Sequence, residues 1–146
     1  MGPVHVINGP NLNLLGIREQ KYYGNLCLKD IEKKISQFCK KKKIQVNFFQ
    51  SNHEGEIIDY LQKYIKKKSM DYFVINPGGL THSSVSLRDT MELLRPNVVE
   101  VHLSHIFKRE KFRQQLITTG AANGLIAGLG YKGYLLAIEY FYLQDG

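Results

Sequence analysis

The run VEVHL contains two side chains that could transfer a proton. Glu100 and His102 stand two positions apart in an apolar segment that predicts a strand, so both side chains point to the same face, with Cα atoms roughly 6 to 7 Å apart. A carboxylate in that position orients the imidazole and favours its protonated form, as a general acid requires. A buried structural ion pair is the alternative that this spacing leaves open.

The run KREKFR offers two guanidinium groups for binding an anion. Arg109 and Arg113 are four positions apart, so a short helix over the basic segment 108–115 would place them on one face. Forked guanidinium donors suit carboxylates and other oxygen-rich ligands. Surface arginines at this spacing are also common, so an exposed helix face is a second interpretation.

The run NPGGLTHSSVSLRD joins a strand end, a glycine turn and polar side chains at a predicted helix start. Thr81, His82, Ser83 and Ser84 supply hydroxyl and imidazole donors there. The sequence has neither GxxxxGK[ST] nor GxGxxG, so its likeness to a phosphate cradle is loose. Helix capping by Thr81 or Ser83 is the competing explanation.

The irregular stretch INGPNLNLLGIREQKYYG, residues 7–24, holds a candidate base. A tyrosine ordinarily has a pKa of about 10, which is too high for a base at neutral pH. The guanidinium of Arg18, with partial exclusion of water, could favour the phenolate of Tyr22 or Tyr23. Spacing alone does not choose between the two tyrosines, and a tyrosine that only packs as a lid would give the same pattern.

These residues need a scaffold that brings them together, and the hydropathy pattern predicts one. Short apolar runs predict five strands, at 4–8, 44–50, 72–76, 98–102 and 125–128. Helical spacing of apolar residues predicts helices around 28–38, 57–65 and 85–94, followed by the basic segment 108–115 and a final apolar segment at 134–143. Strand followed by helix, repeated along the chain, predicts an α/β fold with a parallel sheet and helices on both faces.

The first four predicted strands stop on polar residues, namely Asn8, Gln50, Asn76 and His102. These are carboxyl ends, which meet at one edge of a parallel sheet, and that edge is where open α/β sheets bind ligands. We therefore expect the polar residues to converge on a site. Turn formation also explains such residues, and for Gln50 and Asn52 the two explanations are equally good.

Length and charge narrow the classes of function. The 146 residues, 43% of them hydrophobic, suffice for a single domain spanning 1–146. The net charge of +7 comes largely from lysines at 40–43 and 66–68, which close helical patterns without interleaved aromatic residues. We therefore expect no nucleic-acid partner, and no apolar segment predicts a membrane span.

Cys27 and Cys39 lack the spacing of a CxxC pair and have no nearby histidine cluster, which argues against a zinc site and a disulfide framework. The opening MGPVHVIN does not have the pattern of a signal peptide. A reduced, cytoplasmic setting is the corresponding expectation.

Five motifs together carry a resemblance to a known family: INGPNLNLLGIRE followed by YYG, FFQSNHEGEIIDYLQ, INPGGLTHSSVSLRD, VEVHLSHI followed by REKFR, and GLIAGLGYKGYLLAIEY. In this order they resemble the type II 3-dehydroquinases over almost the whole chain. The resemblance implies a flavodoxin-like three-layer sandwich with a five-stranded parallel sheet. It also implies trimers assembled into a homododecamer, and no metal or organic cofactor.

The activity that the resemblance implies is the reversible dehydration of 3-dehydroquinate to 3-dehydroshikimate, in aromatic biosynthesis or in quinate breakdown. Tyr23 matches the catalytic base and Arg18 the arginine that supports its ionised form, which selects Tyr23 over Tyr22. Asn11 matches the residue that holds a water against the enolate oxygen. His102, positioned by Glu100, matches the general acid.

Further positions match residues that hold the carboxylate and hydroxyl groups of the substrate: Asn76, His82, Leu103, Ser104 and Arg113. Arg109 matches a second functional arginine near the lid, and Asp89 an acidic residue that reaches a neighbouring subunit's site. Two positions depart from the pattern, because Gln20 stands where proline is common and His105 where asparagine is common. Since proline fixes φ, the first departure predicts a more mobile lid.

Two other classes of protein compete with this interpretation. A flavodoxin-like binding or signalling module would need a phosphate loop, or an acidic pocket with a phosphorylatable aspartate at a strand end, whereas these strand ends carry asparagine and histidine. A basic RNA-binding protein would show strongly salt-dependent binding. The other class of dehydroquinase uses a Schiff-base lysine on a much longer barrel.

Overall fold

A computed structural model describes residues 1–17 and 20–146, with the side chains of Gln20 and Tyr23 also outside the description. Within this part of the chain there are five strands: β1 (Val4–Asn8), β2 (Val46–Gln50), β3 (Tyr72–Asn76), β4 (Val98–His102) and β5 (Gly124–Ala127). All pair in parallel, in the order β2-β1-β3-β4-β5. The prediction of a five-stranded parallel sheet is confirmed.

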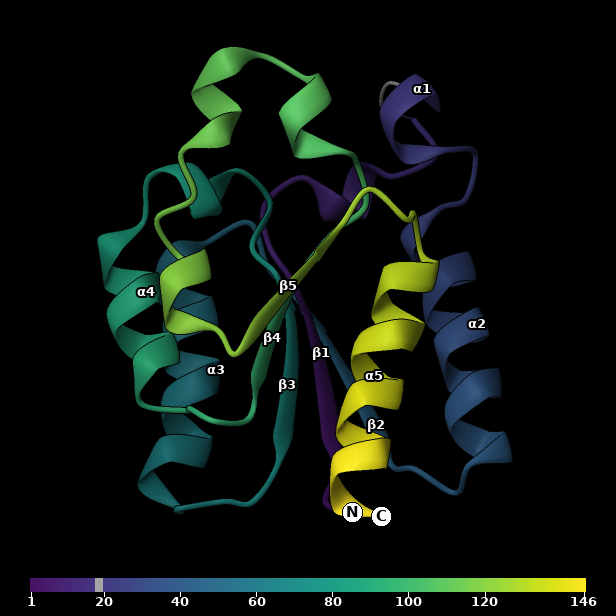
Figure 1. Cartoon of the computed structure of the whole chain (residues 1–146), viewed down its shortest axis with the longest axis vertical. Helices are drawn as coiled ribbons and strands as arrows, with labels where there is room; N and C mark the ends of the chain where they lie inside the picture. The colour runs from purple at the N-terminus through teal and green to yellow at the C-terminus, as the bar shows by residue number, and fades with distance from the viewer. Residues whose placement is uncertain (18–19) are drawn as a thin grey trace.

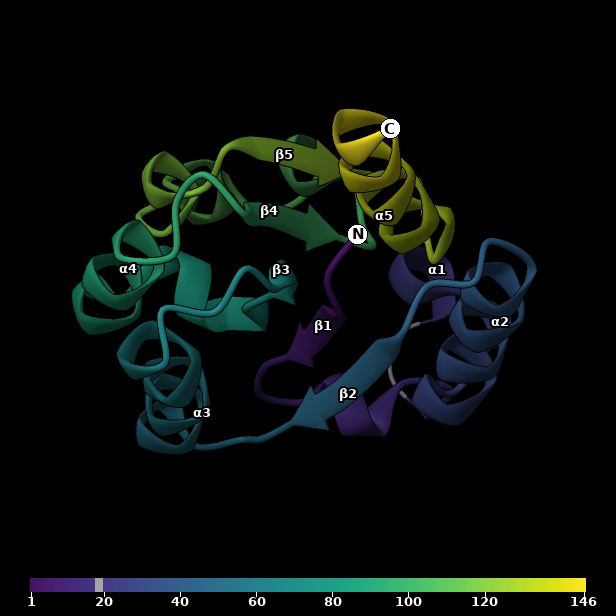
Figure 2. The same cartoon turned by 90° about the horizontal axis from the view of Figure 1, so that it is seen from below.

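The longer helices cover both faces of this sheet. Helices α2 (Leu28–Lys41) and α5 (Lys132–Asp145) lie on one face, and α3 (Glu54–Lys66) and α4 (Val85–Glu92) lie on the other (Figures 1 and 2). The result is three layers, helix, sheet and helix, as in flavodoxin-like folds. No helix in the described part of the chain is both long enough and apolar enough to cross a lipid bilayer.

The central strands are buried because both of their faces are covered. Every residue of β1, β3 and β4 is buried, whereas the edge strands β2 and β5 are partly exposed. Strands buried on both faces need near-continuous apolar sequence, which explains the runs around Val74 and Val99. A polar residue in such a strand, such as Glu100, must therefore find partners inside the fold.

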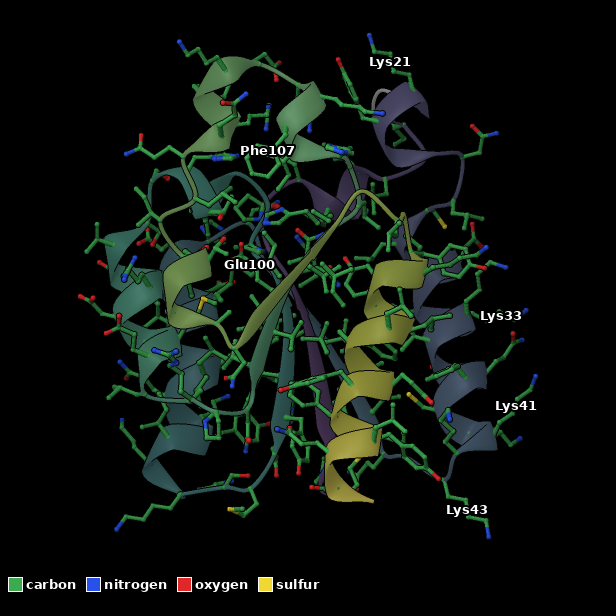
Figure 3. The ribbon with its side chains drawn as sticks, viewed as in Figure 1. Lys21, Lys33, Lys41, Lys43, Glu100 and Phe107 are labelled. Atoms are coloured by element: carbon green, nitrogen blue, oxygen red, sulfur yellow. The ribbon has the colours of Figure 1, made fainter. Side chains whose placement is uncertain are left out.

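Helix α2 shows how the sequence pattern produces this packing. Leu28, Ile31 and Ile35 recur at helical spacing and are buried against the sheet, and the backbone N–H of Cys27 donates to Asp30 at the helix start. Fully burying one such aliphatic side chain contributes about 1.5 to 3 kcal/mol. The other face is basic and points outward, as Lys33 and Lys41 do in Figure 3.

The short elements gather at the end of the sheet opposite the two termini (Figure 1). They are α1 (Gln20–Tyr23) and the short 3₁₀ helices η1 (Leu12–Leu14), η2 (Gly78–His82), η3 (Ile106–Lys108) and η4 (Lys111–Gln114), whereas the remaining 3₁₀ turn, η5 (Thr119–Ala121), lies beside α4 and precedes β5. The carboxyl ends of the strands lie at the same end, where Asn8 is in register with both Gln50 and Asn76. Irregular backbone thus surrounds the edge that the sequence marks as polar.

One predicted element is wrong. The segment 108–115 is not a single helix, because η3 and η4 are separate turns with Arg109 in an extended conformation between them, at φ −101° and ψ −162°. A short helix needs an apolar face to pack, and the large side chains here, Phe107 and Phe112, are exposed by 52% and 63%. The predicted shared helix face of Arg109 and Arg113 is therefore absent.

Candidate active site

A cavity of about 140 Å³ lies at the carboxyl edge of the sheet. Most of the residues proposed from the sequence line it, namely Asn11, Asn76, His82, His102, Leu103, Ser104, Arg109 and Arg113. They come from the last residues of β3 and β4 and from the segments that follow β1, β3 and β4, including η4. The strand ends therefore converge on one polar cavity.

The predicted contact between Glu100 and His102 is confirmed. Nε2 of His102 lies 2.9 Å from Oε2 of Glu100, whose side chain is fully buried. Figure 3 shows Glu100 inside the fold, beneath the segment that carries Phe107. Among the described residues, Nδ1 of His102 has no hydrogen-bond partner, and His102 lines the cavity. The carboxylate thus holds one ring nitrogen and leaves the other for a ligand.

Three threonine hydroxyls surround the carboxylate of Glu100. Thr119 donates to Oε2, Thr81 lies 3.2 Å from the same oxygen, and Thr118 donates to Oε1. Thr118 and Thr81 also lie 2.9 Å apart at their hydroxyl oxygens. Thr81 is a donor that the sequence predicts, whereas Thr118 and Thr119 were not predicted, because the sequence marks them only by two adjacent hydroxyl residues in the short run ITTG.

The surroundings of Glu100 affect its charge in two directions. Burial raises the pKa of the carboxyl group, but the hydrogen bond and charge of His102 and the hydroxyls of Thr118 and Thr119 together outweigh it. The net result is a pKa below the ordinary value of 4.5. Glu100 is therefore a carboxylate at neutral pH and can stabilise an imidazolium at His102.

Asn11 is held at the cavity by its backbone. It adopts a left-handed conformation, with φ 70°, and its N–H donates to Oδ1 of Asn52 at 2.9 Å. Nε2 of Gln50 donates to the same Asn52 oxygen at 3.2 Å and reaches the carbonyl of Gly9 at 3.3 Å. Gln50 and Asn52 therefore position the loop that carries Asn11. Turn formation at the end of a strand does not by itself explain these contacts.

Gly9 allows this loop to approach the turn after β3. A Cβ atom at Gly9 would lie 2.5 Å from the carbonyl oxygen of Pro77, which is closer than Cβ atoms in proteins approach other heavy atoms without a shift of the structure. The Gly9 N–H also donates to the Asn76 carbonyl at 2.8 Å. The two walls of the cavity that carry Asn11 and Asn76 thus meet through backbone contact.

A hydrogen bond to the backbone determines which ring nitrogen of His82 carries a proton. Its Nδ1 lies 2.8 Å from the carbonyl oxygen of Gln115, and because a carbonyl only accepts, Nδ1 must carry a proton. The ring also meets Phe112 edge-on, with centroids 6.3 Å apart. This leaves Nε2 of His82 to face a ligand.

The two arginines reach the cavity from separate turns. Nη1 of Arg109 donates to Oγ of Ser104 at 3.3 Å, and its guanidinium lies 4.3 Å from the ring centroid of Tyr22. Nε of Arg113 donates to Glu110 at 2.6 Å. Two guanidinium groups at one small cavity favour an anionic ligand, as the sequence analysis expected from different local geometry.

Other predicted residues lie elsewhere. Asp89 is exposed on α4 and does not line the cavity. Arg18 lies outside the described residues, as does the side chain of Tyr23, so their predicted roles stay predictions. The side chain of Gln20 is likewise outside the description. His105 is exposed and lines a neighbouring cavity.

That neighbouring cavity is larger, about 520 Å³, and shares Leu103 and Ser104 with the first. Its lining is mainly apolar, with Lys21 and Lys108 among its residues, and it contains neither His102 nor Asn76. Size alone would favour it as the active site, but His102, which pairs with Glu100, and both arginines line the smaller cavity. Within residues 1–17 and 20–146, no cluster of three or more His, Cys, Asp and Glu side chains could hold a metal ion.

Comparison with known proteins identifies the family of this chain. The model of the family described as "Dehydroquinase class II" matches residues 2–142. A 3-dehydroquinate dehydratase of Halothermothrix orenii is 51% identical over 139 residues, covering 95% of this chain and 93% of the relative.

Two solved structures share the fold. The type II dehydroquinase of Butyrivibrio crossotus aligns with a TM-score of 0.91 at 44% identity, covering 95% of this chain and 96% of the other. That of Propionibacterium acnes aligns with a TM-score of 0.91 at 30% identity, covering 97% and 96%. On this agreement of sequence and fold, the chain belongs to the class II dehydroquinase family.

Proposed function

We propose that this chain dehydrates 3-dehydroquinate to 3-dehydroshikimate through an enolate, in the reversible manner implied by its family. The observation that carries the proposal is the buried Glu100–His102 pair at a cavity lined by two arginines. The reaction removes a proton from C2 and hydroxide from C1, so that the new C1=C2 bond is conjugated with the C3 carbonyl. The C1 hydroxyl receives a proton as its C–O bond breaks, so it leaves as water.

His102 supplies that proton. Glu100 fixes Nε2, so the protonated ring presents its Nδ1–H to the cavity and can give it to the C1 hydroxyl as the C–O bond breaks. The carboxylate remains charged throughout and stabilises the imidazolium before the transfer. General acid catalysis of this kind typically contributes about 10² to 10⁴ in rate.

Tyr23 removes the C2 proton as a phenolate, with Arg18 favouring the ionised form, and acts from the side opposite His102. This assignment comes from the family pattern, and it is supported by the position of α1 at the end of the molecule opposite the two termini, where the carboxyl ends of the strands also lie (Figure 1). The adjacent carbonyl makes the C2 proton acidic, and the charge moves to the C3 oxygen as the enolate forms. Asn11 holds a water molecule against that oxygen, which lowers the energy of the enolate.

The remaining side chains hold the substrate. Arg113 and the segment Leu103–Ser104 suit the carboxylate, whereas the imidazole of His82 and the amide of Asn76 suit hydroxyl groups. Arg109 stacks on Tyr22 and so connects α1, the segment that carries the proposed base, to the cavity. Binding at several points fixes C1 and C2 between acid and base.

The assembly belongs to the same proposal. Trimers associate into a cytoplasmic homododecamer, in which Asp89 of one subunit reaches the active site of a neighbour. In support, Asp89 is exposed on α4 and makes no contact with its own chain's cavity. Trimer formation would then complete each site.

The proposal is tested by adding 3-dehydroquinate to purified protein and following the ultraviolet absorbance of the conjugated enone, with the product identified by NMR. Wild-type protein should form 3-dehydroshikimate and water. His102→Ala should lose at least about 100-fold in kcat, within the range for a general acid. His105→Ala is the control, since His105 is exposed outside the cavity, and absence of product with wild-type protein would refute the proposal.

A further inference from the structure

Tyr134 is a fully buried tyrosine whose hydroxyl reaches the active-site edge of the sheet. It lies in α5, is 0% exposed and packs in the apolar cluster between the sheet and α2. Its oxygen lies 2.5 Å from Oδ1 of Asn8 and 2.9 Å from Nδ2 of Asn76. Asn8 and Asn76 are register partners on the neighbouring strands β1 and β3. One hydroxyl therefore joins two strand ends to a helix.

The direction of each hydrogen bond in this cluster is determined. Tyr134 has one hydroxyl proton, and it donates that proton to the Asn8 carbonyl oxygen, which can only accept. It must then accept from the Asn76 amide nitrogen. At the other end of the same amide, Oδ1 of Asn76 accepts from the Gly78 N–H at 3.1 Å. Both ends of the Asn76 amide are thus assigned by their partners.

This assignment decides what Asn76 offers to a ligand. The amide nitrogen has two hydrogens, one of which goes to Tyr134, so the second remains as a donor. Asn76 lines the cavity but is only 3% exposed, so its side chain has little freedom to find another orientation. A flipped amide would present an acceptor instead and would leave the Gly78 N–H facing an NH₂ group.

We propose that Tyr134 is a positioning residue for substrate recognition: its hydroxyl holds the Asn76 amide so that Nδ2 donates to an oxygen of the bound cyclic hydroxy acid. The proposal rests on the proposed function and adds a residue to it that does not touch the substrate. Asn8 acts one step further away, by accepting the Tyr134 proton and so keeping the Tyr134 oxygen as an acceptor for Asn76.

The chemistry of Tyr134 suits this role at all working pH values. Burial raises the pKa of Tyr134 far above its ordinary value of 10, so the hydroxyl keeps its proton. A phenolate here would have no proton for Asn8 and would place a charge in the core. Tyr134 is therefore the opposite of the proposed base Tyr23, whose function requires ionisation.

Kinetics of Tyr134→Phe test the proposal, because this change removes one oxygen and keeps the ring. The expected result is a rise in KM for 3-dehydroquinate of about 5- to 10-fold, the worth of one uncharged hydrogen bond, with kcat changed by less than about 3-fold. Tyr72→Phe is the matched control. Tyr72 is also buried in the same cluster, and its hydroxyl donates to Asp145. It is the first residue of β3, whereas Asn76 is the last, so it lies away from the cavity. It should leave both constants unchanged.

A double-mutant cycle separates positioning from a general structural effect. If Tyr134 acts through Asn76, the KM increase caused by Tyr134→Phe should vanish in an Asn76→Ala background. An equal increase in both backgrounds, or no increase in either, would overturn the inference while the proposed function stands. No turnover by wild-type protein would overturn both.

Thermal melting shows whether Tyr134→Phe folds, and Asn8→Leu serves if it does not. That change removes the acceptor for the Tyr134 proton, which then turns toward Asn76 and competes with the Asn76 donor. The same rise in KM is expected, and a KM equal to that of wild type would contradict the inference.

Discussion

The imidazole Nε2 of His102 lies 2.9 Å from a carboxylate oxygen of Glu100 that has no exposure to solvent. This relationship predicts that the charge of Glu100 contributes to catalysis. Glu100→Gln keeps the shape and an accepting oxygen but removes the charge, so the imidazolium is less stable and kcat should fall by at least about 10-fold. Steady-state kinetics across pH measure this.

Glu139→Gln is the control, because Glu139 lies on α5 and pairs with Lys42, and this variant should keep the wild-type kcat. A wild-type kcat in Glu100→Gln would remove Glu100 from the mechanism.

The threonines around Glu100 predict a pH dependence of stability. Because the pKa of Glu100 is lowered on folding, its contribution to stability is complete above the ordinary value of 4.5 and is lost as pH falls through the folded-state pKa. Thr118→Val removes a hydroxyl donor, so the folded-state pKa rises and the contribution is lost at higher pH. We expect the free energy of unfolding at pH 7 to fall by about 1.5 to 3 kcal/mol.

Denaturant unfolding of this variant at pH values from 3 to 7 measures the effect. Thr90→Val is the matched control, since Thr90 is also buried but bonds to the Ser86 carbonyl in its own helix. Curves of stability against pH with the same midpoint for wild type and Thr118→Val would show that Thr118 does not stabilise the carboxylate.

The backbone contact at Gly9 predicts that a single methyl group there opens the site. In Gly9→Ala the new Cβ would meet the Pro77 carbonyl at 2.5 Å, so the loop carrying Asn11 must move from the turn after β3. We expect a loss of about 1 to 3 kcal/mol in stability, the usual cost of overpacking, and a lower kcat/KM.

Gly79→Ala is the control for Gly9→Ala, because nothing lies within 4 Å of a Cβ at Gly79 in the same cavity wall. Thermal melting and the enone assay on both variants decide the matter. Equal behaviour of the two variants would mean that the close approach at Gly9 is unimportant.

Asp89 provides a test of the proposed assembly. If it reaches a neighbour's site, Asp89→Asn should lower kcat/KM by about 10-fold, the effect of one lost charged hydrogen bond, although the residue does not line its own cavity. Glu92→Gln, on the same helix, should have little effect. Sedimentation velocity should show a dodecamer for wild type. A fully active monomer would contradict the assembly and this role together.

The sequence pattern predicted the features of the site that depend on the periodicity of a strand. Alternation along a strand places Glu100 and His102 on one face, and apolar runs ending on Asn8 and Asn76 place these residues at one edge. Both predictions are confirmed by the structure. The same logic failed for 108–115, since the spacing of two arginines does not form a helix where no apolar face is buried.

Contacts between distant segments could not be predicted in this way. Tyr134 meets Asn8 across 126 positions, and Thr118 meets Glu100 from a loop with no regular pattern. Such contacts depend on how the helical layers pack against the sheet. The sequence shows that a residue carries a hydroxyl group, but it does not show which distant residue that group will contact. A single sequence can identify strand ends but not the residues that hold them.

The central claim is that a tyrosine from the amino-terminal loop removes the C2 proton, and the adjacent Tyr22 and Tyr23 permit its most direct test. In the enone assay, Tyr23→Phe should reduce kcat by at least about 100-fold, as expected for a lost general base, with binding of product retained in calorimetry. Tyr22→Phe should retain kcat within about 3-fold, since it removes an oxygen and keeps the ring that stacks on Arg109. Near-normal turnover by Tyr23→Phe would contradict the account.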